Sequence, residues 1–216
     1  MSKERTSIRM SATDRQRQLL DAALTVFSRK GFKGATTKEI ASEAGVAEAV
    51  IFQHFPSKEA LYNAVLELNL GAWETERDAE YIRECMERCD DEALFRVFIL
   101  RILNCYRTNL AFQRVIMFAA LEGHEQGIRR LQEQFAPVYK QFQEYIEKRQ
   151  REGVLADGDP FAILIYLGSG AHHYGLVSGL ITSVMRVAAR DIPDEAIAEQ
   201  FARILLDGIR KQKRKR

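Results

Sequence analysis

The sequence predicts an all-α protein of about nine helices, in which an N-terminal three-helix helix-turn-helix domain precedes a larger helical domain. Three observations predict this class. Segments with apolar residues at helical spacing recur along the chain, and no segment shows the alternation of apolar and polar residues typical of a half-buried strand. The breaks between segments are short and rich in turn formers. The chain has only 4 prolines and no low-complexity tract, which argues against long linkers.

The first helix is expected over residues 14–30. Its sequence places Leu20, Leu24 and Phe27 on one face at helical spacing. Gly31 follows two basic residues, which is typical of a helix C-terminus.

A second short helix is expected over residues 36–44, because Thr36 and Glu39 have the spacing of a capping box. Gly45 then supplies a turn, and a third helix of barely two turns follows over residues 48–54. Helices this short are unstable in isolation. They must be held by a shared core, whose expected members are Leu20, Leu24, Phe27, Ile40, Ala41, Val46, Ile51 and Phe55.

The remaining helices fill the rest of the chain. Pro56 ends the third helix, and Ser57 offers an N-cap for the fourth. We expect residues 1–56 to form the helix-turn-helix domain and residues 57–216 to form the larger domain. The expected helices of the larger domain cover residues 58–79, 91–108, 110–121, 124–152, 161–189 and 194–210.

Charge is unevenly distributed. Residues 1–56 carry a net charge of +3, residues 57–209 carry −7, and the tail from Arg210 adds +6. The basic ends could contact a polyanion that the acidic middle would repel, although a basic tail can also be a solvated chain end.

The longest run without Lys, Arg, Asp or Glu extends from Phe161 to Met185. It contains four glycines and the pair His172-His173, so we interpret it as a helix buried on several sides and not as a membrane span. The N-terminus has no signal segment, and the 3 cysteines suggest no disulfide framework. A cytoplasmic location without membrane contact is therefore expected.

The stretch EAGVAEAVIFQHFPSK, residues 43–58, has the arrangement of a helix-turn-helix, whose second helix can enter a DNA major groove. One side of that helix must bury Val46, Ile51 and Phe55, which explains its apolar character. The first turn and the outer side remain free to face DNA. A methyl group of Val50 could press on a thymine methyl.

The longer stretch GFKGATTKEIASEAGVAEAVIFQHFPSKEALYNAV resembles the DNA-binding region of TetR/AcrR-type transcriptional repressors, with a continuous match over residues 19–68. The resemblance implies a regulator that is not an enzyme, has no cofactor, binds a palindromic operator as a homodimer and is released by a small hydrophobic effector. Carried over by position, it implies base contacts by Glu48, Ala49, Val50 and Phe52, and phosphate or groove-edge contacts by Thr36, Thr37, Lys38, Gln53, His54 and Lys58.

Two residues depart from the family pattern. Phe52 stands where the family often has a tyrosine, so that a hydroxyl contact with phosphate is absent. Glu48 replaces a commonly basic or polar residue, and its carboxylate can only accept hydrogen bonds, as from a cytosine amino group. Both changes could weaken DNA binding.

The resemblance also implies that the larger domain binds the effector and dimerises through its last two helices, residues 161–189 and 194–210. Small residues recur on one face of the first of these helices, at Gly168, Ala171, Gly175, Ser178 and Thr182. We favour a contact between subunits over packing within one chain as the reason for this stripe.

The effector site is expected among the aromatic and aliphatic residues of the larger domain, although such stripes can also be ordinary core. Asn104 and His173 could orient the effector. The other expected lining residues are Trp73, Phe98, Ile102, Tyr106, Phe112, Met117, Phe118, Tyr139, Phe142 and Tyr174.

Two alternatives remain open: a helical enzyme acting on a small molecule, and a thiol-based redox sensor. The sequence has no glycine-rich phosphate loop or nucleophile elbow, and the adjacent pair His172-His173 is a poor chelate, so no metal site is expected. Cys85 and Cys89 lie one helical turn apart, where a disulfide would be strained, and free thiols are expected.

Overall fold

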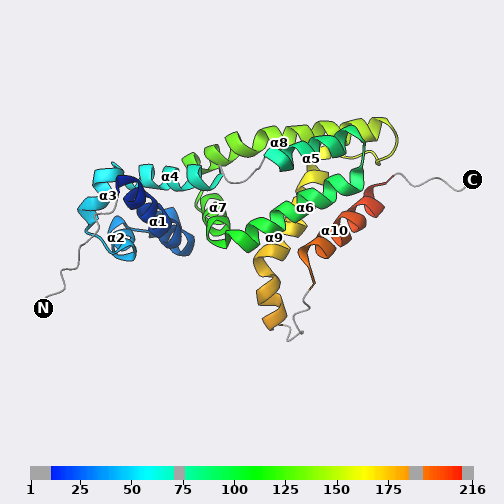
Figure 1. Cartoon of the computed structure of the whole chain (residues 1–216). Coiled ribbons are helices and arrows are strands. Elements are labelled where there is room, and N and C mark those ends of the chain that lie inside the picture. The colour runs from blue at the N-terminus through cyan, green and yellow to red at the C-terminus, as the bar shows by residue number, and fades with distance from the viewer. Residues whose placement is uncertain (1–10, 71–75, 185–191, 211–216) are drawn as a thin grey trace, which may run out of the picture. The chain divides into compact units, whose positions relative to one another are not determined.

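The computed structural model describes residues 11–70, 76–184 and 192–210, without the side chains of residues 76–77 and 179–182 (Figure 1). Apolar periodicity and end-capping produce ten helices in this part of the chain, so the predicted all-α class is confirmed. In chain order they are α1 (Ala12–Gly34), α2 (Thr37–Ala44), α3 (Glu48–His54), α4 (Lys58–Leu70), α5 (Glu76–Glu87), α6 (Asp91–Thr108), α7 (Leu110–Glu122), α8 (Glu125–Arg151), α9 (Pro160–Val184) and α10 (Asp194–Ile209).

The extra helix comes from the region predicted as one helix over residues 58–79. Within the described residues this region contains α4, which ends at Leu70, and α5, which begins at Glu76 and extends to Glu87. Ile82 and Cys85 lie one turn apart on α5 and are both buried, and Met86 packs beside them. This buried apolar stripe lies beyond residue 79, the predicted end of the helix, and it explains why α5 continues to Glu87.

The helices group into two compact units. The first unit contains α1 to α4, α7 from Ala111 and the start of α8 up to Arg130. The second contains α5, α6, the rest of α8, α9 and α10. Each unit therefore combines separate stretches of the sequence, and the division into a DNA-binding and an effector domain at residue 56 stays a prediction.

The core of the first unit joins α1, α2, α3 and α4. Phe27 of α1 is fully buried and meets Tyr62 of α4 edge-on, with ring centroids 5.0 Å apart. Of the predicted core residues, Leu24 and Val46 are only half-buried. The other six, which are buried as predicted, are Leu20, Phe27, Ile40, Ala41, Ile51 and Phe55.

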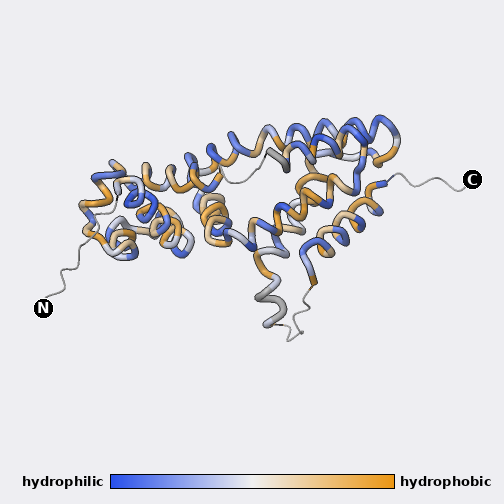
Figure 2. The backbone as a smooth tube through the Cα atoms, viewed as in Figure 1, coloured by the Kyte–Doolittle hydropathy of each residue, from blue (hydrophilic) through white to orange (hydrophobic). Residues whose placement is uncertain are grey.

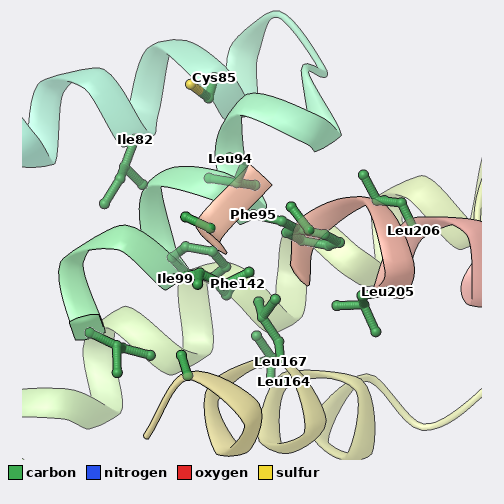
Figure 3. Close-up of a cluster of buried hydrophobic side chains, with 14 of the residues drawn as sticks. Ile82, Cys85, Leu94, Phe95, Ile99, Phe142, Leu164, Leu167, Leu205 and Leu206 are labelled. Atoms are coloured by element: carbon green, nitrogen blue, oxygen red, sulfur yellow. The ribbon is translucent and has the colours of Figure 1, made fainter. Parts of the chain in front are cut away.

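The core of the second unit forms around α6, which packs against α5, α9 and α10. Figure 3 shows Phe95 and Ile99 of α6 converging with Phe142 of α8 and with leucines of α9 and α10. Hydropathy follows this arrangement, because the tube of α8 is mostly blue over its second half, where only a stripe is buried (Figure 2). Among the residues that the structure describes, no helix combines the length and the hydropathy that a bilayer span requires.

Gly168 and Gly175 of the small-residue stripe of α9 pack within the chain, which corrects the expectation of a subunit contact for these two residues, whereas the side chain of Thr182 lies outside the described residues. Gly168 is buried, and a Cβ there would lie 3.9 Å from Phe98 and Ile102 of α6. Gly175 is closer still, because a Cβ there would lie 2.6 Å from the ring of Tyr106. Small residues thus let α9 approach α6 of the same chain.

Candidate nucleic-acid interface

The turn between α2 and α3 has the geometry that a helix-turn-helix requires. Gly45 ends α2 in the left-handed conformation (φ 66°, ψ 35°), which favours glycine. Its N–H group contacts the carbonyl oxygen of Ser42 at 3.1 Å, and the next N–H, of Val46, contacts that of Ala41 at 2.9 Å. The predicted glycine turn is confirmed, and it directs the chain into α3.

The outer side of α3 is free for contact. Ile51 is fully buried and fixes the helix to the core, whereas Val50 and His54 are half-buried. Phe52 has half of its surface exposed, at 50%. The remaining exposed residues of this short helix are Glu48, Ala49 and Gln53.

The N-terminus of α2 lies beside that of α3. Thr36 and Glu39 form both hydrogen bonds of a capping box, as predicted. The hydroxyl of Thr37 donates a hydrogen bond to the carboxylate of Glu48, which joins the first turns of the two helices. Lys38 is exposed.

Polar contacts hold α2 against α1 near both ends of α2. Lys30 donates to Glu39 at 2.5 Å, and this bond, together with bonds from Thr36, lowers the pKa of the Glu39 carboxyl. Gln18 donates to the carbonyl oxygen of Ala44 at 2.8 Å, at the end of α2. The sequence analysis did not identify either contact, because each joins residues of different helices.

Lys58 makes contacts within the chain that the sequence analysis did not predict. Its ammonium donates to the carbonyl oxygens of Phe32 and Ala35, both at 2.9 Å, and lies 4.4 Å from the centre of the Phe32 ring. The ammonium is therefore directed to the end of α1, and its predicted contact with a phosphate stays a prediction. Ser57 caps α4 as predicted, because its hydroxyl accepts from the N–H of Ala60 at 3.1 Å.

Residues 19–65, which run from α1 into α4 and contain this geometry, match the family model described as "Bacterial regulatory proteins, tetR family". The comparisons support a TetR-family transcriptional regulator. It is 27% identical over 197 residues to the HTH-type transcriptional regulator RutR of Escherichia coli K12, with 91% of each chain covered. The HTH-type transcriptional activator FasR of Mycolicibacterium smegmatis is 48% identical over 59 residues, which cover 27% of each chain.

Solved structures of similar fold extend over nearly the whole chain. The ketosteroid transcriptional regulator KstR2 of Mycobacterium tuberculosis gives a TM-score of 0.67 at 17% identity, covering 94% of this chain and 98% of that one. A linker-substituted mutant of HlyIIR gives 0.66 at 16% identity, covering 95% and 100%. These likenesses show that both units have the TetR-type fold.

The predicted effector residues are divided between the two units, and their role stays a prediction. Phe112, Met117 and Phe118 belong to the first unit, where Met117 is exposed. Trp73 lies outside the described residues. The second unit holds the rest, which are Phe98, Ile102, Asn104, Tyr106, Tyr139, Phe142, His173 and Tyr174.

Within the second unit, His172 and not His173 turns toward the core. The hydroxyl of Tyr106 lies 3.2 Å from Nδ1 of His172, and burial lowers the pKa of that imidazole and raises the pKa of the Tyr106 phenol. His173 and Asn104 are exposed. Their predicted role in orienting an effector stays a prediction, whereas His172 is a residue that the sequence analysis did not select.

A hollow of about 300 Å³ lies on the outer side of α9 and α10. It is lined in part by Tyr166, Gly170 and Phe201 and contains none of the predicted effector residues. Tyr166 and Ile204 beside it are 67% and 61% exposed, which leaves large apolar side chains uncovered on two adjacent helices.

Proposed function

We propose that this TetR-family regulator binds a palindromic DNA operator as a homodimer and represses transcription until a small hydrophobic effector releases it. The observation that carries the proposal is the exposed outer side of α3, held from behind by the buried Ile51. A short helix braced in this way can lie in a major groove with its first turn against base edges. Ala49 permits close approach, and Phe52 offers apolar contact.

Dimerisation is proposed through α9 and α10. Tyr166 on α9 and Ile204 on α10 are exposed and apolar, and both line the hollow described above. A second copy could cover this face by a twofold contact, in which the same surface serves both subunits. The interface then uses the face of α9 opposite to its small-residue stripe.

The effector is proposed to bind in the second unit, whose core is rich in Phe, Ile and Leu side chains. Release requires only that the effector bind more tightly to the dimer geometry that fits DNA poorly. A coupling of this kind explains how an apolar molecule could regulate DNA binding without touching the DNA.

Selection of duplexes from a random DNA pool by the purified full-length protein tests the proposal, followed by binding to the selected duplex over a range of salt. We expect two symmetric half-sites. Lys38→Ala should weaken binding to all sequences alike and reduce the salt slope by about one, whereas Gln53→Ala should relax the preference at one base position. Lys140→Ala, at an exposed lysine paired with Glu144 in the second unit, is the matched control. Recovery of no preferred duplex at low salt would refute the proposal.

A further inference from the structure

The turn between α7 and α8 holds the segment that leads into α2. Glu122, at the end of α7, accepts a hydrogen bond from the N–H of Phe32 at 3.0 Å and from the N–H of Lys33 at 3.3 Å. The ammonium of Lys33 donates in return to the carbonyl oxygen of Glu122 at 3.0 Å. Glu122, about 90 positions later in the chain, thus accepts from two successive amides of residues 32–35, the last residues of α1 and its C-cap Ala35, which together form the α1–α2 connection.

Gly31 makes this contact possible. It leaves the helical conformation inside α1 (φ 70°, ψ −177°), in a region that favours glycine. A Cβ at this position would collide with the carboxylate of Glu122 and lie 2.9 Å from the ring of Phe118. The break in α1 and the approach of α7 therefore depend on the same residue.

His124 forms the second half of the turn. Its Nδ1 accepts the N–H of Gly127 at 3.0 Å and so caps the start of α8, which requires that Nδ1 carry no proton. Its Nε2 lies 3.4 Å from a carboxylate oxygen of Glu59 on α4. The ring is buried and packs against Phe32 and Tyr62, with centroid distances of 4.3 and 4.8 Å. His124 thus joins α8 to both α4 and the end of α1.

Lys58 holds the same connection from the α4 side, through the carbonyl oxygens of Phe32 and Ala35. The next residue is Thr36, the N-cap of α2, and Thr37 and Lys38 follow it. Fixing residues 32–35 at both their N–H and C=O groups therefore fixes where the first turn of α2 begins.

We propose that Glu122 and His124 are positioning residues for DNA binding, which set the α1–α2 connection and, through it, the first turn of α2. This inference rests on the proposed function. The two residues do not touch DNA themselves. They act by keeping Thr36, Thr37 and Lys38 in the arrangement that a duplex requires, so that their loss lowers the fraction of protein competent to bind. Because α8 continues beyond Arg130 into the second unit, the turn stands at the start of a helix that both units share.

Paired variants of the full-length protein test this inference on the selected duplex. Glu122→Ala and His124→Phe remove the acceptors, and both should raise the Kd by about tenfold, as a tenfold loss of the competent state requires. Glu122→Gln keeps a side-chain acceptor, and His124→Asn keeps a helix-capping oxygen, so each should recover most of the affinity. Glu125→Ala, at the exposed first position of α8, is the matched control and should stay within about twofold of the wild type.

Hydrogen exchange of the amides supplies the readout that distinguishes positioning from general loss of stability. The Phe32 and Lys33 amides should exchange faster in Glu122→Ala, and the Gly127 amide faster in His124→Phe, whereas amides in the core of α6 should be unchanged. If Glu122→Ala does not fold, the comparison of His124→Phe with His124→Asn still tests the inference. Wild-type affinity in folded Glu122→Ala and His124→Phe would overturn the inference, and so would equal weakening by Glu125→Ala. Failure of the wild-type protein to select any DNA would instead refute the proposed function.

Discussion

Replacing Asp91 with alanine should strongly destabilise the second unit, because this carboxylate is the centre of a buried polar network. Asp91 accepts two hydrogen bonds from the guanidinium of Arg149, at 2.8 and 3.0 Å, and one from the hydroxyl of Tyr145 at 2.5 Å. It is buried, and the Arg149 side chain is only 12% exposed. The hydrogen bonds to Asp91 raise the pKa of Arg149 further, so the guanidinium stays charged.

The magnitude follows from what the substitution leaves behind. Breaking a buried ion pair by removing one partner costs about 3–5 kcal/mol, because the remaining charge loses its compensation. Glu152 still pairs with the other guanidinium nitrogen of Arg149, so the lower end, about 3 kcal/mol, is expected. For a chain of this size, each kcal/mol corresponds to about 2–4 °C in Tm, which gives a decrease of about 6–12 °C.

A bidentate pair at the surface provides the comparison. Arg107 donates to Asp194 at 2.9 and 3.0 Å, but its side chain is 58% exposed. Asp194→Ala should therefore cost less than about 1 kcal/mol. Differential scanning calorimetry of the full-length variants measures both changes. The double variant Asp91→Leu/Arg149→Met should be more stable than Asp91→Ala, since no buried charge is left unpaired. Equal effects of Asp91→Ala and Asp194→Ala on Tm would refute the reasoning.

Three further predictions concern α6 and α9. Gly175→Ala should destabilise the protein by about 1–3 kcal/mol, because its Cβ would lie 2.6 Å from the ring of Tyr106. Gly168→Ala should stabilise the protein by up to about 1 kcal/mol, because a Cβ there would have no neighbour nearer than 3.9 Å. Urea unfolding measures both changes. Burial lowers the pKa of His172, so that the unfolded chain binds a proton before the folded chain does as the pH falls below 6.5. The free energy of unfolding should therefore decrease below pH 6.5, and it should decrease less in His172→Asn. Unfolding measured at pH 7.5 and at pH 5.5 would show the difference. Burial raises the pKa of Cys105 from 9.0 to about 11, so alkylation by iodoacetamide at pH 8 should be about a hundredfold slower than in the unfolded chain, and equal rates would contradict this assignment.

Local rules predicted the helix-turn-helix well because its determinants are local. The capping box of Thr36 and Glu39 and the glycine turn at Gly45 each depend on residues within a few positions, and the structure has both. Ser57 as the cap of α4 is a further example. The extension of α5 to Glu87 was missed because helical spacing alone does not show where a helix ends.

Contacts between distant helices could not be found in the same way. A lysine at the start of a helix suggests a phosphate contact, but it does not show that Lys58 meets the carbonyl oxygens at the end of α1. A stripe of small residues shows that some helix approaches closely, but it does not show which one. In α9 the partner is α6 of the same chain, as the contacts at Gly168 and Gly175 demonstrate. The contacts of Glu122 and His124 could not be predicted from the sequence, because their partners are about 60–90 residues away.

The thiol-sensor alternative concerned Cys85 and Cys89, and the buried Cys85 gives it no support. Burial raises the pKa of Cys85, which lowers the thiolate fraction that a peroxide would attack. Burial has the same effect on Cys105. Redox sensors instead require an accessible thiol with a depressed pKa, and neither of these residues meets that condition.

The composition of α3 has a consequence for how DNA affinity is distributed over the first unit. This helix contains no lysine or arginine, and its one carboxylate, of Glu48, already accepts a hydrogen bond from Thr37. Because phosphate contacts by cations supply most of the affinity of DNA-binding proteins, α3 can contribute shape and base contacts but little electrostatic attraction. The exposed Lys38 on the first turn of α2 must then carry a larger share than it would beside a basic recognition helix. A displacement of that turn should therefore be costly for binding, which is why residues that only hold it in place, such as Glu122, should be as important as residues that touch the duplex.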